Sequence, residues 1–278
     1  MNLKSIKLKL FNIGKTITNS YIKDNNIKGK IIRYGNNKRQ YYKVYTPYSS
    51  NLKSTIFFIH GGGWWHGNPS LYSGVGKFFY KLGYQTVLCG YRLVPFHRYP
   101  TQIDDVFKAL KHYIECNKEI NSIVIAGYSA GGELASRLVF DHDRQLKYNI
   151  NKDLLKGFIS LSGVLDFSKC TSIYSKILVN NYVYKSNIKK ANPISLLNKE
   201  VNLPILCIHG ESDSLINVNT SISFIKKVNN LDENTILKTI KRAEHEDTID
   251  IVRGDGNKYS EYILRFIKEI DDIKKIDI

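Results

Sequence analysis

A serine stands at the centre of a G-x-S-x-G motif at residues 127–131. The motif follows an apolar run at residues 123–126 and leads into a segment with helical spacing, which is the context of a sharp strand-to-helix turn. In such a turn the flanking glycines let the chain segments pass closely, and the following helix brings the positive end of its dipole near the hydroxyl. Ser129 is therefore predicted to be a nucleophile.

The segment from His60 to Trp64 contains three successive glycines, at positions 61–63, and it closes another apolar run. Glycines leave their backbone N–H groups unshielded, so two or three of these groups can point at one negatively charged oxygen. The segment is predicted to supply donors that stabilise an oxyanion. His60 is predicted to have a structural role, as is His209 at the end of a later apolar run.

A serine hydroxyl needs a general base, and the base needs a carboxylate that orients it. His245 is the candidate base, because it follows the last predicted strand, where the chain returns to the carboxyl edge of the sheet. Asp213 lies in the loop after the preceding predicted strand, which gives the chain order serine, acid, histidine. Glu211 in the same loop and Asp166 after an earlier strand remain alternatives for the acid.

Short apolar runs and segments with helical spacing alternate along the chain. Six runs are predicted to be strands buried on both faces: 55–60, 86–89, 123–126, 157–161, 205–208 and 236–240. Five segments have helical spacing: 72–82, 103–116, 131–140, 222–228 and 259–273. This alternation predicts an α/β fold in which helices cover both faces of a mostly parallel central sheet.

Two further runs, at residues 30–34 and 41–45, are rich in Ile, Tyr and Val and flank the turn-like residues 35–37. They are predicted to form an antiparallel hairpin at one edge of the sheet. The sequence has no internal repeat, low-complexity tract or linker, so one domain spanning residues 1–278 is predicted. Residues 166–200 have no clear period and are predicted to form a small lid over the strand ends, or else a plain surface insertion.

Residues 1–28 are predicted to be a helical extension of this domain. Apolar residues at positions 3, 6, 10, 13 and 17 share one helix face, and lysines lie on the opposite face. The apolar face is expected to dock onto the domain, with contact between residues 1–20 and a membrane surface as the alternative. The same residues lack the continuous apolar run of a signal peptide, which predicts a cytoplasmic location.

The chain has 278 residues, of which 42% are apolar, and no apolar run is long enough to span a membrane. Its 41 basic and 25 acidic residues give a formal net charge of +16. Because the basic residues are spread along the whole chain, no nucleic-acid partner is predicted. The four cysteines are widely separated, which predicts reduced thiols and neither a zinc site nor a redox pair.

Several ordered motifs together resemble the α/β-hydrolase superfamily, and within it the hormone-sensitive-lipase-like carboxylesterases and a smaller arylformamidase-like branch. The resemblance covers about residues 30–270. Besides His245, it rests on the motifs at residues 60–64, 91–95, 100–105, 127–132, 192–195 and 209–213. Tyr128 stands where many lipase-like esterases have Asp, and the segment before the first strand is short. Both features are similar to the smaller branch.

The resemblance implies a serine hydrolase with three catalytic side chains and three oxyanion donors. These are Ser129, Asp213 and His245, and the backbone N–H groups of Gly62, Gly63 and Ala130. The resemblance also implies that Tyr91, Arg92 and Asp105 form a structural element, in which a buried ion pair braces the glycine loop.

The expected activity is hydrolysis of a small-molecule carboxylic ester through an acyl-enzyme, with no metal or organic cofactor. The alternatives are an arylformamidase acting on N-formylkynurenine, a peptidase or membrane-surface lipase, and a non-catalytic binding protein on a hydrolase scaffold. The candidates for the pocket wall are Trp64, Trp65, His66, Tyr72 and Tyr128, with core packing as the alternative for each. The oligomeric state is left open.

Overall fold

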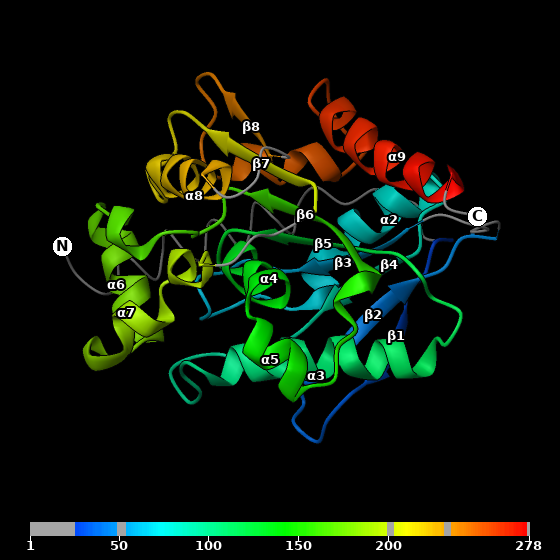
Figure 1. Cartoon of the computed structure of the whole chain (residues 1–278), viewed down its shortest axis with the longest axis horizontal. Helices are drawn as coiled ribbons and strands as arrows, with labels where there is room; N and C mark the ends of the chain where they lie inside the picture. The colour runs from blue at the N-terminus through cyan, green and yellow to red at the C-terminus, as the bar shows by residue number, and fades with distance from the viewer. Residues whose placement is uncertain (1–25, 49–53, 199–202, 231–234, 277–278) are drawn as a thin grey trace.

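A computed structural model describes residues 26–48, 54–198, 203–230 and 235–276 (Figure 1). A sheet of eight strands runs through these residues in the order β1-β2-β4-β3-β5-β6-β7-β8. The strands are β1 Lys30–Arg33, β2 Tyr41–Tyr45, β3 Thr55–Ile59, β4 Thr86–Cys89, β5 Ile123–Tyr128, β6 Leu155–Leu161, β7 Ile205–Gly210 and β8 Thr235–Ile240. The helix predicted for residues 3–17 lies outside the described residues.

The pairing of the strands confirms the predicted sheet. β1 and β2 form an antiparallel hairpin, and β2 also pairs antiparallel with β4. All the remaining neighbours pair parallel. β3 and β4 have the sequences TIFFI and TVLC, and every one of their residues is buried, as expected of strands that are covered on both faces.

Helices cover both faces of the sheet, and the helical spacing predicted five of them. These are α2 Ser73–Lys81, α3 Thr101–Cys116, α4 Ala130–Phe140, α8 Asn219–Asn229 and α9 Ser260–Ile276. α2 packs on β4 and α9 packs on β6, whereas α4 contacts β3, β5 and β6 and has α3 beside it. Figure 1 shows α2 and α9 on one side of the sheet and α3 and α4 on the other. The short helix α5 His142–Lys147, capped by Asp141, was not predicted.

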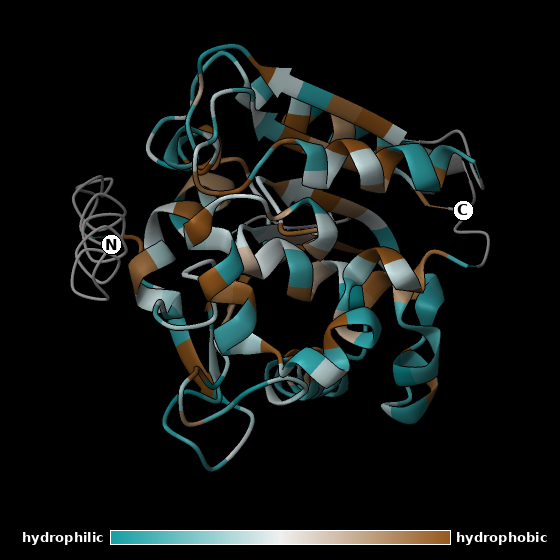
Figure 2. Cartoon of the chain, turned by 90° about the vertical axis from the view of Figure 1, so that its left-hand side faces the viewer, coloured by the Kyte–Doolittle hydropathy of each residue, from teal (hydrophilic) through white to brown (hydrophobic). Residues whose placement is uncertain are grey.

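The segment between β6 and β7 folds into short helices. They are η3 Phe167–Lys169, α6 Ile173–Tyr182, η4 Lys185–Asn187, α7 Ile188–Ala191 and η5 Pro193–Leu196. Figure 2 looks onto the side that carries α6 and α7 and shows hydrophobic and hydrophilic residues close together there. α6 lies beside two loops at the strand ends, because Leu178 contacts Gly63 and Ser172 Oγ donates to the carbonyl of Leu215. The lid role of this segment stays a prediction.

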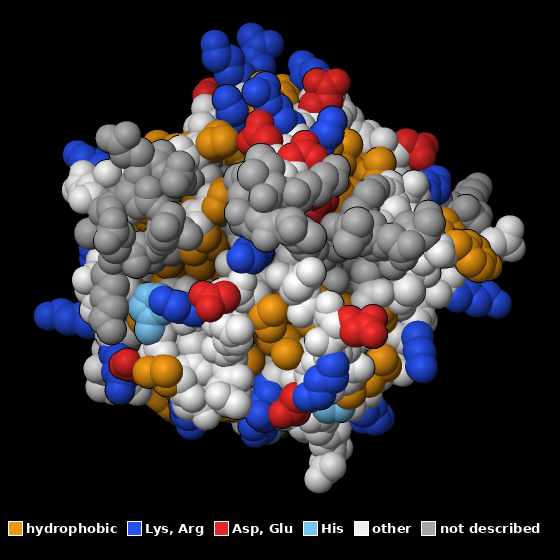
Figure 3. Space-filling view, turned by 45° about the vertical axis from the view of Figure 1, so that its right-hand side comes forward, with side chains coloured by type: hydrophobic (Ala, Val, Ile, Leu, Met, Phe, Trp, Pro, Cys, Tyr) orange, Lys and Arg blue, Asp and Glu red, His pale blue; other side chains and the backbone are white. Residues whose placement is uncertain are grey.

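The charged side chains and the cysteines of the described residues do not point to a particular binding partner. Figure 3 shows lysine and arginine side chains spread around one face, with acidic side chains among them. The four cysteines are free thiols, and only Cys116 is exposed. Within the described residues, no helix has the length and apolar character needed to cross a membrane.

The turn between β5 and α4 holds Ser129 at φ 55° and ψ −122°, a conformation that side chains disfavour. The Ser129 N–H donates to the carbonyl of Leu161 at 2.9 Å, which ties the turn to β6. Two glycines allow the chain segments to pass. A Cβ on Gly127 would lie 2.2 Å from the carbonyl oxygen of Gly131, and a Cβ on Gly131 would lie 2.1 Å from the carbonyl oxygen of Ile59.

Gly131→Ala tests this close approach. The added methyl group has to displace the backbone of β3, so we expect the free energy of unfolding to fall by about 3 kcal/mol or more. Gly254→Ala is the control, because Gly254 has φ 71° but open space at its Cβ position. Only backbone strain of about 1 kcal/mol is expected there. Urea denaturation measures both losses, and equal losses would contradict the close-approach argument.

Candidate active site

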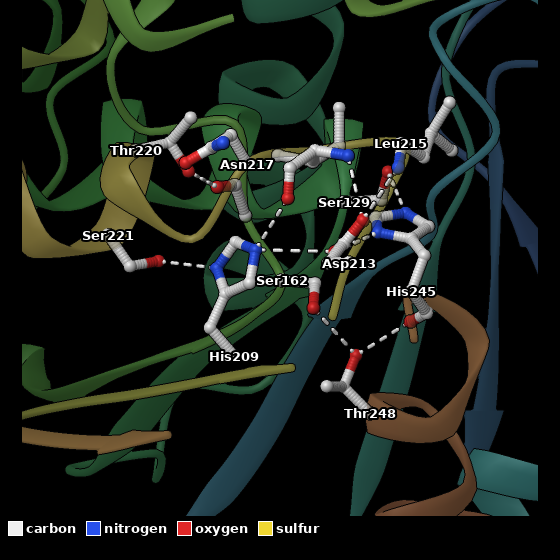
Figure 4. A network of polar contacts seen from close by, with 12 residues as sticks. Ser129, Ser162, His209, Asp213, Leu215, Asn217, Thr220, Ser221, His245 and Thr248 are labelled. Carbon is white, nitrogen blue, oxygen red and sulfur yellow. Dashed lines mark hydrogen bonds and ion pairs between the residues drawn. The ribbon is translucent and has the colours of Figure 1, made fainter. Parts of the chain in front are cut away.

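Three side chains from different parts of the chain meet at the carboxyl ends of the strands (Figure 4). Ser129 Oγ lies 2.9 Å from Nε2 of His245, and Nδ1 of His245 lies 2.7 Å from Oδ2 of Asp213. Ser129 follows β5, Asp213 follows β7, and His245 follows β8 just before the short helix η6 Glu246–Thr248. All three side chains are buried. The structure thus brings together the residues predicted as nucleophile, acid and base.

The two alternative acids have other partners. Asp166 holds the segment between β6 and β7, accepting a hydrogen bond from Nδ2 of Asn192 at 3.0 Å. Glu211 is exposed and accepts a hydrogen bond from a threonine of β8. Among the described residues, the carboxylate that is hydrogen-bonded to the imidazole of His245 is Asp213.

Asp213 is surrounded by donors. Its Oδ1 accepts hydrogen bonds from the backbone N–H groups of Leu215 at 3.0 Å and Ile216 at 2.7 Å. Its Oδ2 lies 2.7 Å from Nδ1 of His245 and 3.2 Å from Nε2 of His209. Burial by itself raises the pKa of Asp213, but the charge of His245 and the hydrogen bonds from both histidines hold that pKa well below its usual range. Asp213 is therefore a fixed anion beside His245.

Opposing effects act on the imidazole of His245. Burial by itself lowers the pKa of His245, but the charge and hydrogen bond of Asp213 raise it, with smaller contributions from the glutamates on either side of the histidine. The net result is a pKa above the ordinary value for histidine. Because Asp213 accepts the Nδ1 hydrogen, Nε2 is the nitrogen that faces Ser129 and can take up its proton.

The glycine loop, residues 60–64, makes a tight turn next to Ser129. Gly62, Gly63 and Trp64 have φ angles of 116°, 61° and 60°. A Cβ on Gly62 would lie 2.2 Å from the carbonyl oxygen of His66. Only glycine avoids that clash and also adopts this φ without strain.

The predicted oxyanion donors lie around this turn. Gly61 places the loop against the nucleophile, since a Cβ on Gly61 would lie 3.1 Å from Cβ of Ser129. The backbone N–H groups of Gly62, Gly63 and Ala130 have no hydrogen-bond acceptor among the described residues. Ala130 is the first residue of α4, where helix N–H groups have no partner within the helix. These three N–H groups can therefore be offered to a ligand.

Of the structural element that the resemblance implies, Tyr91 contacts the glycine loop, whereas the ion pair of Arg92 and Asp105 has its further contact with Gln40. The Tyr91 hydroxyl donates to the carbonyl of His60 at 2.9 Å, and Nδ1 of His60 lies 2.7 Å from the carbonyl oxygen of Gly61. Arg92 donates through Nε and Nη2 to both carboxylate oxygens of Asp105, at 2.8 and 2.7 Å, and the Asp105 side chain is fully buried. Burial lowers the pKa of His60 to about 3, in keeping with a structural role.

The residues predicted to form the pocket wall differ in burial. Trp65 and His66 are partly exposed, whereas Trp64, Tyr72 and Tyr128 are at most 2% exposed. Tyr128 packs beside His245, with its ring centroid 5.1 Å from that of the imidazole. Trp64 stacks at 4.2 Å on the tyrosine that ends α6. Its burial favours the core-packing alternative.

A buried glutamate that the sequence analysis did not single out joins three segments. Glu133 on α4 is fully buried and accepts hydrogen bonds from Nε1 of Trp64 and the hydroxyl of Tyr182, each at 3.2 Å. Arg137, one turn later, donates to Glu133 at 3.0 Å and also to the carbonyl of Ala191. The signal in the sequence was a Glu and an Arg four residues apart on a helix that is mainly apolar. Their distant partners left no such signal.

Comparison with known proteins gives one family and several relatives. The BD-FAE family matches residues 43–228. Kynurenine formamidase from Meyerozyma guilliermondii is 25% identical over 202 residues, which cover 68% of this chain and 76% of that protein. Arylacetamide deacetylase from Bos taurus is 31% identical over 123 residues, which cover 39% of this chain and 31% of that protein. This second match thus spans about a third of the relative's length.

A solved structure shares the fold. Esterase B from Lactobacillus Rhamnosis superposes with a TM-score of 0.82, covering 99% of this chain and 96% of that chain, at 18% sequence identity. The likeness at this identity concerns the fold alone.

Glu133→Gln tests the buried network. Glutamine keeps the shape of the side chain but removes the charge, so Arg137 is left buried without its counter-ion, and the free energy of unfolding is expected to fall by about 3 kcal/mol. The double variant E133Q/R137M also removes the uncompensated charge and is expected to be more stable than E133Q.

The control is Glu269→Gln, which removes an exposed ion pair with Arg265 and is expected to change stability by less than about 0.5 kcal/mol. Urea denaturation measures all three variants. A double variant no more stable than E133Q would refute the ion-pair account.

Proposed function

Because the chain belongs to the BD-FAE family and has the α/β-hydrolase fold, we propose that it is a serine hydrolase that cleaves small carboxylic esters through an acyl-enzyme. One observation carries this proposal: the continuous series of contacts from Asp213 through His245 to Ser129. These residue types in this arrangement activate a serine hydroxyl on several unrelated folds.

The first half of the reaction acylates the serine. Nε2 of His245 takes the proton of Ser129 Oγ while the oxygen attacks the carbonyl carbon of the ester. The carbonyl oxygen becomes an oxyanion, which accepts hydrogen bonds from the N–H groups of Gly62, Gly63 and Ala130. As the carbonyl re-forms, the bond to the alcohol breaks, and His245 gives its proton to the departing alcohol.

The second half releases the acid. His245 takes a proton from water, the resulting hydroxide attacks the acyl-enzyme, and a second oxyanion forms at the same donors. When this intermediate collapses, the carboxylic acid leaves and the proton returns to Ser129. Throughout, Asp213 holds the Nδ1 hydrogen of His245 and stabilises the imidazolium.

The packing around the site supports a small acyl group. Leu178 of α6 contacts Gly63, since a Cβ on that glycine would lie 2.7 Å from Cδ2 of Leu178. Ser129 is only 5% exposed. We therefore infer that the segment between β6 and β7 acts as a small lid, with α6 limiting the length of the acyl chain beside the oxyanion donors.

N-formylkynurenine is a second candidate substrate. The match to kynurenine formamidase covers 76% of that relative. The acyl group of N-formylkynurenine is a formyl group, which is the smallest acyl group. The same steps would break the C–N bond of the formyl amide, with His245 giving its proton to the departing arylamine. The two candidates differ in the leaving group rather than in the catalytic apparatus.

Hydrolysis of p-nitrophenyl acetate, butyrate and octanoate beside N-formylkynurenine tests the proposal. We expect the acetate and butyrate esters to be cleaved faster than the octanoate, because α6 restricts the site. Ser129→Ala is the control and is expected to lower kcat by about 10³-fold or more at unchanged thermal stability. A large preference for N-formylkynurenine would instead select the second candidate, and turnover that survives in Ser129→Ala would refute the serine mechanism.

Asp213→Asn and Asp166→Asn form a matched pair of changes at buried aspartates. Asparagine at position 213 cannot hold the Nδ1 hydrogen of His245 in the same way, so kcat is expected to fall about 10³-fold or more. Asp166→Asn weakens the anchoring of the segment between β6 and β7, so kcat is expected to stay within about tenfold of wild type. Steady-state kinetics on p-nitrophenyl butyrate measure kcat for both variants and so identify which aspartate is the acid. A reversed order would make Asp166 the acid.

A further inference from the structure

A second histidine lies against the acid of the site, on the side away from the nucleophile (Figure 4). His209 ends β7, has no exposed surface, and stands four residues before Asp213. Its Nε2 lies 3.2 Å from Oδ2 of Asp213, the same oxygen that lies 2.7 Å from Nδ1 of His245. Two imidazoles therefore share one carboxylate oxygen.

The surroundings of His209 show where its hydrogen lies. Nε2 is 2.9 Å from the carbonyl oxygen of Ile216, which can only accept a hydrogen bond, so Nε2 carries a hydrogen. Nδ1 is 2.8 Å from the hydroxyl of Ser221. The Nε2–H group thus donates to the Ile216 carbonyl and lies beside Oδ2 of Asp213, while Ser221 contacts Nδ1 on the other side of the ring.

From this geometry we propose that His209 is a positioning residue, which fixes the Asp213 carboxylate and withdraws part of its negative charge from His245. The proposal rests on the function proposed above, because it assigns a role to His209 within that same site. A donor on Oδ2 stabilises the Asp213 anion and reduces its pull on the proton of His245. With His209 in place, His245 is a weaker base than Asp213 alone would make it.

The other groups around His245 do not depend on His209. Glu244 and Glu246 flank His245 and raise its pKa, and Tyr128 packs on its ring. Asp213 Oδ1 accepts hydrogen bonds from the backbone N–H groups of Leu215 and Ile216, which do not involve the side chain of His209. A change at His209 therefore alters the contacts of Oδ2 and of the Ile216 carbonyl, and it leaves the remaining charges of the site as they were.

The test compares two replacements of His209 in the full chain. His209→Met has a similar length but no donor, whereas His209→Gln keeps an N–H group near the position of Nε2. NMR titration of the His245 imidazole gives its pKa directly. We expect His209→Met to raise the pKa of His245 by about half a unit to one unit, and His209→Gln to raise it by less than half as much.

The pH profile of kcat/KM on p-nitrophenyl butyrate provides a second readout. Activity requires unprotonated His245, so it is lost as the pH falls through the pKa of His245. A raised pKa therefore moves the acid limb of the profile to higher pH, by the same amount as in the titration. A merely structural role for His209 would lower activity at every pH without moving this limb.

Ser221→Ala serves as a third variant if His209→Met does not fold. It leaves His209 in place but removes the hydroxyl that holds Nδ1, so a smaller upward shift in the pKa of His245 is expected. An unchanged pKa of His245 in His209→Met, or in Ser221→Ala where only that variant folds, would overturn the proposal. Equal shifts in His209→Met and His209→Gln would do the same.

The titration needs no turnover, which separates the two proposals. Absence of hydrolysis with a shifted His245 pKa would remove the proposed function and leave the role of His209 as a donor to Asp213. Hydrolysis with an unshifted His245 pKa would leave the proposed function standing and remove the role of His209.

Discussion

The contact of Gly131 with the end of β3 sets the spacing of the whole site. Its Cα faces the carbonyl oxygens of Ile59 and His60, at a distance that leaves no room for a side chain. The glycine loop starts at that point of the chain, so the same contact that seats the turn after β5 also brings the loop against Ser129. Ser129 and the N–H groups proposed as oxyanion donors are thereby positioned by backbone packing, which is stiffer than contacts between long side chains.

A buried charge extends this arrangement to the segment between β6 and β7. Glu133 lies one turn after the start of α4, and its carboxylate accepts from Trp64 at the end of the glycine loop and from Tyr182 at the end of α6. A carboxylate without solvent is stable only when its donors are in place, and Arg137 supplies the compensating charge. Movement of α6 would break these bonds, so the segment between β6 and β7 and the glycine loop are expected to keep one relative position.

The sequence was sufficient to predict those features that are determined by neighbouring residues. Glycines around Ser129, apolar runs of strand length and the order of the elements predicted the turn, the sheet and the strand ends where His245 and Asp213 lie. The choice among Asp213, Asp166 and Glu211 depended on where each loop directs its side chain, and no local pattern contains that information. Glu133 is bonded to Trp64, which is 69 positions away in the sequence, and to Tyr182, which is 49 positions away. Sequence patterns are local and therefore could not predict these contacts.

The arrangement around Asp213 shows why a structural histidine can matter to the chemistry. A base that works near neutral pH must be held by an anion, or it loses its orientation, yet a strongly basic imidazole is already protonated and cannot accept the serine proton. Burial opposes the charged form of His245 and Asp213 favours it. A donor at Oδ2 of Asp213 satisfies both requirements. It leaves the hydrogen bond between Asp213 and Nδ1 of His245 intact, and it reduces the negative charge that raises the basicity of the imidazole. His209 occupies that position at the end of β7, so the basicity of His245 is adjusted by a group that reaches it through Asp213 alone.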